Sequence, residues 1–139
     1  MERQSSIERF VKAQEIMYPI ALQEMRDGGK RSHWIWYIFP QIQGLGRSNN
    51  ARYYGIRDIK EAEEYLHHPI LGKRIREITL VLLEHSTDDI LCLMGSRIDA
   101  VKLRSSMTLF DAISPDDIFS EVLDVFFNGN RDKLTLDVL

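Results

Sequence analysis

The chain has 139 residues, of which 44% are hydrophobic and 28% are charged. This length is usual for one domain, and the composition is that of a globular protein, which excludes a disordered chain. Its 18 lysine and arginine residues are outnumbered by 21 aspartate and glutamate residues, and the net charge of −3 excludes a generally basic, histone-like nucleic-acid binder. Cys92 is the single cysteine, which excludes an internal disulfide and a thiolate zinc cluster.

Targeting signals are not evident in the sequence. The first residues have no apolar stretch of signal-peptide length, and no segment approaches the ~20 apolar residues needed to cross a bilayer. We therefore expect a soluble, cytoplasmic protein without a membrane partner, folded as one domain over residues 1–139.

Proline and glycine divide the first part of the chain into predicted helices. Ser5 and Glu8 have capping-box spacing and predict a helix start. Pro19 is expected to end or kink this helix, because proline lacks an amide hydrogen and disfavours helical geometry in the residue before it. A second helix is then predicted from Pro19 to the glycine pair at 28–29.

The aromatic run at residues 34–39 predicts a short helix with Ser32 as its N-cap. Six consecutive aromatic or branched residues could equally form a buried strand, but the chain has no second strong strand pattern to pair with it. Ser48 is predicted to cap a short helix over residues 50–54, which Gly55 ends.

Capping residues also place helices in the rest of the chain. Asp58 is predicted to cap a helix over 59–66, and His68 to cap a longer one that begins at Pro69. Further helices are predicted over 87–94 with Ser86 as the cap, over 98–112, over 115–127 after Ser114, and over 132–139. These segments predict an all-α fold, an irregular compact bundle of seven to nine helices.

The segment 98–112 predicts a helix with two apolar faces. One face carries Ile98, Val101 and Leu109, and the other carries Leu103, Met107 and Phe110. Two such faces imply a central helix sandwiched in the interior. Arg104 lies between them and must be paired or face a cavity. It either forms an ion pair with an internal carboxylate or joins Ser105 and Thr108 in a polar pocket for an anionic ligand.

Charge is unevenly distributed along the chain. Residues 26–60 carry seven basic and two acidic groups, a charge of +5, whereas residues 111–139 carry two basic and seven acidic groups, a charge of −5. The basic block also contains the aromatic run, and this mixture could stack on a ring and neutralise a phosphate. The competing interpretation is that the basic block pairs with the acidic helix near the C-terminus.

Two smaller features suggest other roles. The loop Gly44-Leu45-Gly46-Arg47-Ser48 runs into a helix N-terminus, which is either a weak anion site or an ordinary tight turn. His33 lies in the basic cluster, where it is either a proton carrier or a structural side chain. Cys92 has apolar neighbours and is expected to be inert core.

Several segments together resemble the family catalogued as domain of unknown function 1810. They are Lys30-Arg31-Ser32-His33-Trp34-x-Trp36-x-x-Phe39-Pro40-Gln41, residues 44–48, Tyr54-Gly55-Ile56, His68-Pro69-x-Leu71-Gly72 and residues 102–110. The resemblance extends from Phe10 to Leu136 and implies a compact, mainly α-helical single domain in a mostly bacterial family. It implies no established activity. Some members are labelled calpastatin-like, although calpastatin-type inhibitors are extended chains and this composition is that of a packed globule.

We predict a protein that binds, or acts on, a phosphate-bearing small molecule such as a nucleotide derivative. The predicted ligand-binding residues are Arg31, Trp34, Trp36, Arg47, Arg52, Tyr54, Arg104 and Thr108. If there is a reaction, His33 is the predicted catalytic proton carrier. No metal and no cofactor are predicted, because no ligand set with metal spacing is present. The alternative is a non-catalytic interaction module that docks an acidic protein or an RNA, with nucleic acid the less favoured partner.

Overall fold

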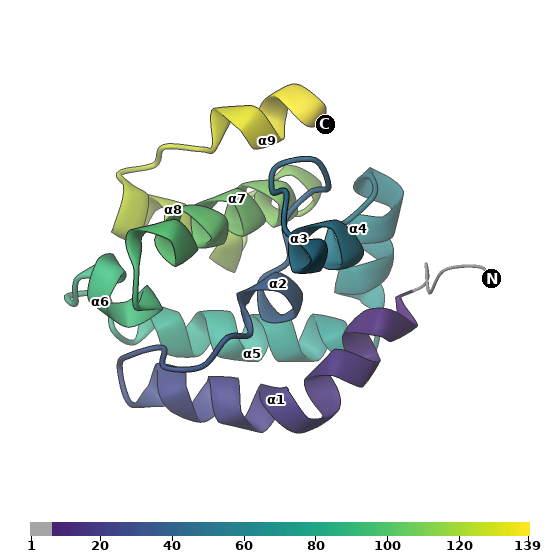
Figure 1. Cartoon of the computed structure of the whole chain (residues 1–139). Coiled ribbons are helices and arrows are strands. Elements are labelled where there is room, and N and C mark those ends of the chain that lie inside the picture. Colours follow the sequence, from purple (N-terminus) through teal and green to yellow (C-terminus); the bar gives the residue numbers. More distant parts are fainter. Residues whose placement is uncertain (1–6) are drawn as a thin grey trace.

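The computed structural model describes residues 7–139, which form nine α-helices and no β-strand (Figure 1). The helices are α1 (Glu8–Arg26), α2 (Ile35–Ile38), α3 (Asn49–Tyr54), α4 (Ile59–His67), α5 (Leu71–Leu83), α6 (Ile90–Met94), α7 (Arg97–Ile113), α8 (Ile118–Phe127) and α9 (Lys133–Val138). The all-α fold and the predicted number of helices are confirmed, as is a helix rather than a strand in the aromatic run. Ser5, the predicted first cap, lies outside the described residues.

The predicted break at Pro19 is wrong, because α1 continues through it without interruption. Pro19 and Glu15, the residue four positions earlier whose carbonyl loses its usual donor, are both exposed. The opposite side of the helix is held by Tyr18, which is buried and donates to Glu77 Oε1 of α5 over 2.6 Å. Packing of α1 on α5 therefore overrides the local preference of proline.

Three predicted helix caps are confirmed. Ser48 and Asp58 each accept a hydrogen bond from the backbone N–H three residues later, at 3.1 and 2.9 Å. Asp132, for which the sequence predicted no cap role, accepts in the same way at 3.1 Å and caps α9. His68 Nδ1 accepts from the backbone N–H groups of Ile70 and Leu71, at the start of α5. The three confirmed caps were predictable because donor and acceptor lie within three residues of each other.

Three predicted caps are wrong because a neighbouring residue takes the role or because the side chain is engaged elsewhere. Ser32 bonds to Glu24 and does not cap α2. Asp89 caps α6 in place of Ser86, so that helix begins at Ile90. Asp117 caps α8 in place of Ser114, whose hydroxyl donates to Asp117 over 2.7 Å. Just before Asp117, Asp116 has a φ of 57°, which ends any helical run from 115.

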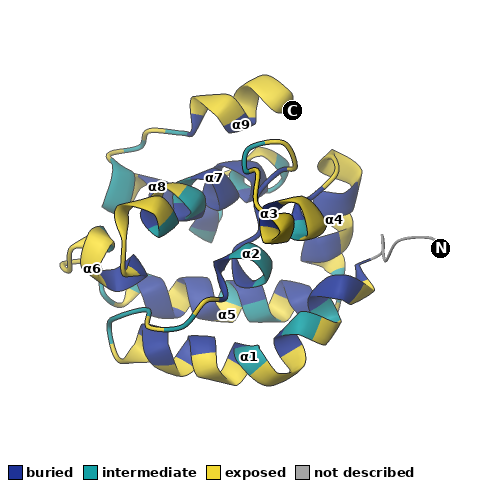
Figure 2. Ribbon diagram, viewed as in Figure 1, coloured by how far each residue is buried: buried dark blue, intermediate teal, exposed yellow. Residues whose placement is uncertain are grey.

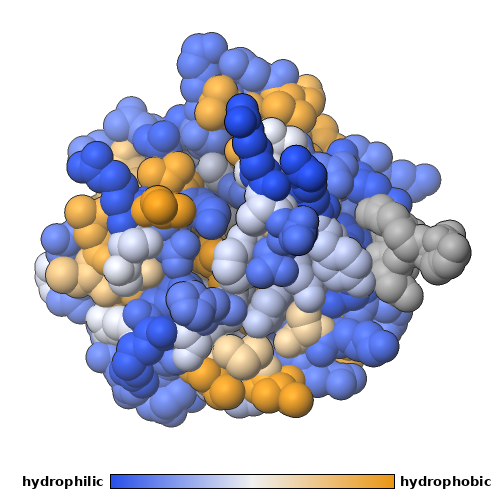
Figure 3. All heavy atoms as spheres, in the orientation of Figure 1, coloured by the Kyte–Doolittle hydropathy of each residue, from blue (hydrophilic) through white to orange (hydrophobic). Residues whose placement is uncertain are grey.

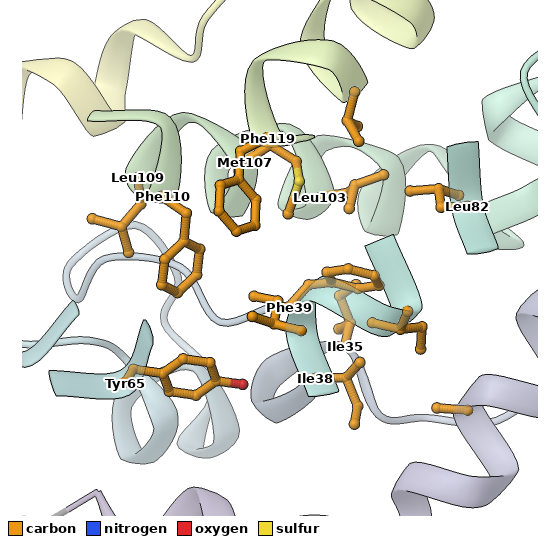
Figure 4. Close-up of a cluster of buried hydrophobic side chains, with 14 of the residues drawn as sticks. Ile35, Ile38, Phe39, Tyr65, Leu82, Leu103, Met107, Leu109, Phe110 and Phe119 are labelled. Carbon is orange, nitrogen blue, oxygen red and sulfur yellow. The ribbon is translucent and has the colours of Figure 1, made fainter. Parts of the chain in front are cut away.

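The long helices stack in layers, with α1 against α5, α5 against α8, and α8 against α7 (Figure 1). Buried faces point inward between these layers, whereas α9 at the top of the view is almost entirely exposed (Figure 2). Side chains of α2 and Tyr65 of α4 face those of α7 and Phe119 inside the molecule (Figure 4). The core therefore lies beneath α7 and around the short helix α2.

The central position of α7 is confirmed, since it packs against α2, α4, α6, α8 and α9. Leu103, Met107, Leu109 and Phe110 are completely buried. The first two residues of the other predicted apolar face are not, because Ile98 is 66% and Val101 is 47% exposed. The prediction of two buried faces is therefore wrong for the N-terminal half of α7, where nothing in residues 7–139 covers these two side chains.

Candidate functional site

Glu24 on α1 organises the basic segment that follows it. Its buried carboxylate accepts from the backbone N–H groups of Arg31 and Ser32, from Ser32 Oγ, and from Trp34 Nε1 at 2.9 Å. Burial raises the pKa of Glu24, but these hydrogen bonds outweigh it and lower the pKa to about 2. Trp34 is completely buried here, so the structure gives it a place in the core.

His33 and Arg31 lie on the surface beside this buried cluster. Arg31 is exposed and forms an ion pair with Asp27 at 3.2 Å. His33 is also exposed, and its carbonyl accepts a hydrogen bond of 3.5 Å from the Tyr37 hydroxyl. Neither side chain lines any of the cavities described below.

The two arginines of the glycine loop and α3 are separated from that cluster. Arg47 is exposed beside Gly46 and forms no ion pair with a described residue. Arg52 lines a shallow cleft with Gln43, Asn49 and Tyr53. At the start of α3, Ser48 already occupies one of the free N–H groups that an anion would use, and the helix has only six residues.

Arg104 and Thr108 belong to a polar cluster around Asp132, which fixes the start of α9. Asp132 is buried, forms an ion pair with Arg104 at 3.5 Å and accepts from Ser105 Oγ at 3.0 Å and Thr135 Oγ1 at 2.5 Å. Thr108 Oγ1 accepts from the backbone N–H of Asp132 at 2.9 Å. The structure therefore shows the ion pair with an internal carboxylate, one of the two alternatives for Arg104.

The alternative pairing of the basic block with the acidic helix is wrong for the described residues. Within residues 7–139 the basic block forms ion pairs with other carboxylates: Lys30 with Asp99, Arg31 with Asp27, and Arg57 with Glu61. On the acidic helix, Asp117 pairs with Arg76 of α5 at 2.9 Å. This acidic helix, α8, packs against α5 and α7, and its packing on α5 brings Asp117 to Arg76.

Trp36 and Tyr54 do come together, in a narrow pocket between α2, α3 and α7. The pocket is also lined by Gln41, Asn50 and Lys102, and it leaves room for about one water molecule. The Trp36 Nε1 atom is buried and has no hydrogen-bond acceptor among the described residues. We call this cavity the indole pocket.

A larger groove lies next to the indole pocket, with a volume of about 320 Å³. It runs between the N-terminal half of α7, the loop after Gln41 and the start of α9. We call it the α7 groove, and its lining residues are Gln41, Leu45, Gly46, Arg97, Ile98, Val101, Lys102, Ser105, Asp132 and Leu134. Figure 3 shows hydrophobic surface on this face, at the left over the beginning of α7 and at the top over α9. Gln41 and Lys102 line both cavities and mark their junction.

The junction carries positive charge that the protein does not fully neutralise. Lys102 Nζ lies 5.1 Å from the centre of the Trp36 ring and 4.0 Å from Asp99. Asp99 is already paired more closely with Lys30, at 2.8 Å. Arg97 is exposed at the groove and has no ion pair with a described residue. With Asp132 neutralised by Arg104, the groove has a positive field suited to an anion.

Gly46 is required for the shape of this wall. A Cβ atom at Gly46 would lie 2.6 Å from the Cβ of Ala51, so any larger residue would push the loop away from α3. The loop is further held by a parallel bridge between Ile42 and Ile56. The glycine loop of the sequence thus shapes the groove through close packing of its backbone.

Sequence reasoning missed Lys102, Arg97 and the exposed pair Ile98 and Val101 as site residues. Ile98 and Val101 fit the pattern of a helix face that points into the core, and only the structure shows that they are exposed. One feature of the sequence could have indicated this exposure, namely Arg97, a charged residue directly before Ile98. Cys92, expected in the core, is exposed, because it lies on the outer side of the short helix α6.

Residues 7–139 contain no group of three or more histidine, cysteine, aspartate or glutamate side chains placed to hold a metal ion. No helix in this range is both long and apolar enough to cross a bilayer.

Comparison with known proteins identifies a family and a solved structure with a similar fold. Residues 4–139 match the sequence model of a family described as a protein of unknown function (DUF1810). The crystal structure of the conserved hypothetical protein Rv1873 from Mycobacterium tuberculosis is similar, with a TM-score of 0.91 and 39% identity over 95% of this chain and 94% of that chain. No curated protein matches. Neither description names a ligand, a partner or a reaction.

Proposed function

The chain belongs to the DUF1810 family of proteins of unknown function, and from this premise we propose that it binds a phosphate-bearing small molecule in the α7 groove. The anionic group lies at the junction with the indole pocket, within reach of Lys102 and Gln41. The observation that carries this assignment is the junction itself, where the incompletely neutralised Lys102 lies 5.1 Å from the centre of the Trp36 ring and the buried N–H of that ring has no acceptor among residues 7–139.

Two physical arguments support an anion at this place. Buried donors in folded proteins are almost always paired. Trp36 Nε1 is one of four buried side-chain atoms without a partner among the described residues, with Thr79 Oγ1, Arg104 Nε and Ser106 Oγ, and of these four residues it is Trp36 that lines the indole pocket, where a bound oxygen acceptor would satisfy its N–H. A phosphate also offers several acceptor oxygens, enough to meet Lys102 and Arg97 together with a neutral donor. The volume of the groove lies within the range of small-molecule sites.

Of the residues predicted from the sequence, Trp36 and Tyr54 line the indole pocket, and Arg104 reaches the groove through Asp132. We propose binding without assigning a reaction. The exposed His33 is not among the residues that line either cavity.

The proposed function is tested by thermal denaturation with inorganic phosphate, methyl phosphate and adenosine monophosphate. A ligand present at 100 times its dissociation constant stabilises a protein by about 2.7 kcal/mol. We expect such stabilisation in the wild type and its loss in Lys102→Met. The matched control is Lys133→Met on α9, whose side chain is 85% exposed and is not among the residues that line either cavity. Equal stabilisation of both variants would contradict the proposed site.

The second candidate function is docking of a partner protein, and the exposed aliphatic face of α9 favours it. Leu134, Leu136 and Val138 are 63%, 49% and 54% exposed on this short helix. This alternative is distinguished by the same measurement, since it predicts that none of the small anions stabilises the wild type.

A further inference from the structure

The walls of the α7 groove indicate what kind of molecule carries the phosphate. Beyond Lys102 the lining is aliphatic, with Ile98 and Val101 on one side and Leu45 and Leu134 on the other. None of the residues that line the groove is aromatic. A nucleobase is usually held by stacking and by edge hydrogen bonds, and this stretch of the groove offers little of either.

We propose that the ligand is a single-chain amphiphilic anion, with its charged group at Lys102 and an alkyl chain along the aliphatic part of the groove. This inference rests on the proposed function and names the chemical class of its ligand. The charged end lies at Lys102, because this lysine lines both the indole pocket and the groove, whereas Arg97 lies at the start of α7 next to Ile98. A neutral hydrocarbon would leave both cations unused.

The exposure of the aliphatic residues supports a chain rather than a compact ring. Ile98 and Val101 are three residues apart on one side of α7, and Leu134 of α9 faces the same groove. From Lys102 back to Ile98 the helix spans about 6 Å, which suits a short alkyl chain. Ser105 and Asp132, on the other side of Lys102, are bonded to each other, so the polar groups there are satisfied.

The test compares methyl phosphate with hexyl phosphate by isothermal titration calorimetry. Burial of one methylene group tightens binding by about fourfold, and with partial burial we expect hexyl phosphate to bind at least about tenfold more tightly. The Val101→Ser variant should lose most of this difference between the two phosphates. The matched control is Val125→Ser on α8, since Val125 and Val101 are 45% and 47% exposed.

The outcomes separate the two proposals. If both phosphates bind equally well and Lys102→Met abolishes both, the proposed function stands and the alkyl chain is wrong. If neither phosphate binds, both proposals fail. If hexyl phosphate keeps its advantage in Val101→Ser, the chain lies elsewhere and the inference is overturned. Binding only to anionic phosphatidylglycerol vesicles, and not to free hexyl phosphate, would also overturn it.

Discussion

The two tryptophans, two residues apart in the sequence, have similar neighbours but differ in burial and in the hydrogen bonding of the indole N–H. A lysine ammonium lies over each indole. Lys30 Nζ is 5.0 Å from the centre of the Trp34 ring, and Lys102 Nζ is 5.1 Å from the centre of the Trp36 ring. Both lysines contact Asp99. The N–H of Trp34 donates to Glu24, whereas the N–H of Trp36 is buried without an acceptor.

This difference separates a structural region from a region that can accept a ligand. Around Glu24 every donor that approaches the carboxylate is used, and the segment after α1 is held in one conformation. Around Trp36 a donor and a cation remain available next to an open groove. A buried donor that lacks its partner is thus more informative about function than aromatic or basic content alone.

The largest effect is expected from removing the acceptor on the Trp34 side. Glu24→Ala leaves Trp34 Nε1 and two backbone N–H groups without their charged acceptor. We expect the free energy of unfolding to fall by about 3–5 kcal/mol, since each hydrogen bond to a charged group contributes about 1.5–3 kcal/mol. Urea denaturation measures this loss. A change below about 1 kcal/mol would show that the Glu24 cluster does not hold the segment.

Acid should weaken the same region. The pKa of Glu24 is lowered from 4.5 to about 2 in the folded protein, so its contribution is complete above about pH 5 and is lost as the pH falls toward 2. The shift corresponds to about 3 kcal/mol. Glu24→Gln should therefore be less sensitive to pH than the wild type between pH 5 and pH 2, as measured by urea midpoints. Parallel pH profiles of the two proteins would contradict this.

A smaller effect is expected where α9 is attached. Asp132→Ala removes the α9 cap and the partner of Arg104, which is partly exposed, so the cost should be about 2 kcal/mol. The loss of stability should be local. Compared with the wild type, the variant should show faster amide hydrogen exchange in α9 and unchanged exchange in α5. Uniform acceleration across the chain would instead indicate that Asp132 supports the whole fold.

The smallest effect on stability is expected on the Trp36 side. Trp36→Phe removes a donor that has no acceptor, so the free energy of unfolding should change by about 1 kcal/mol or less. Trp34→Phe, the matched variant, should cost about 2–4 kcal/mol because it loses a charged hydrogen bond and leaves a cavity. Equal costs for the two variants would remove the contrast between the two sites.

The sequence predicted those parts of the fold that depend on local chemistry. Ser48 and Asp58 cap helices through bonds that span three residues, and no distant residue is needed. Pro19 was misread because the packing of Tyr18 on α5 lies far away in the sequence. The start of α8 was misplaced because Asp117 competes with Ser114 for the same role.

The candidate site was less predictable, because it depends on which surfaces remain uncovered. The aromatic residues of the basic block predicted Trp36 and Tyr54 as ligand-binding residues, and both line the indole pocket. Periodicity alone could not show that Val101 is exposed while Leu109 on the same stripe is buried. The difference depends on how the other helices pack around α7, which the sequence pattern does not contain.

The most direct test of the Trp36 site is a titration followed by nuclear magnetic resonance. The chain has two tryptophans and therefore two indole N–H signals in a ¹H–¹⁵N correlation spectrum. Trp34→Phe and Trp36→Phe assign them. On addition of hexyl phosphate, the Trp36 signal should shift progressively to saturation, as its N–H gains an acceptor, while the Trp34 signal stays in place. If the Trp36 signal does not move while calorimetry reports binding, the ligand is not at the junction and the account is wrong.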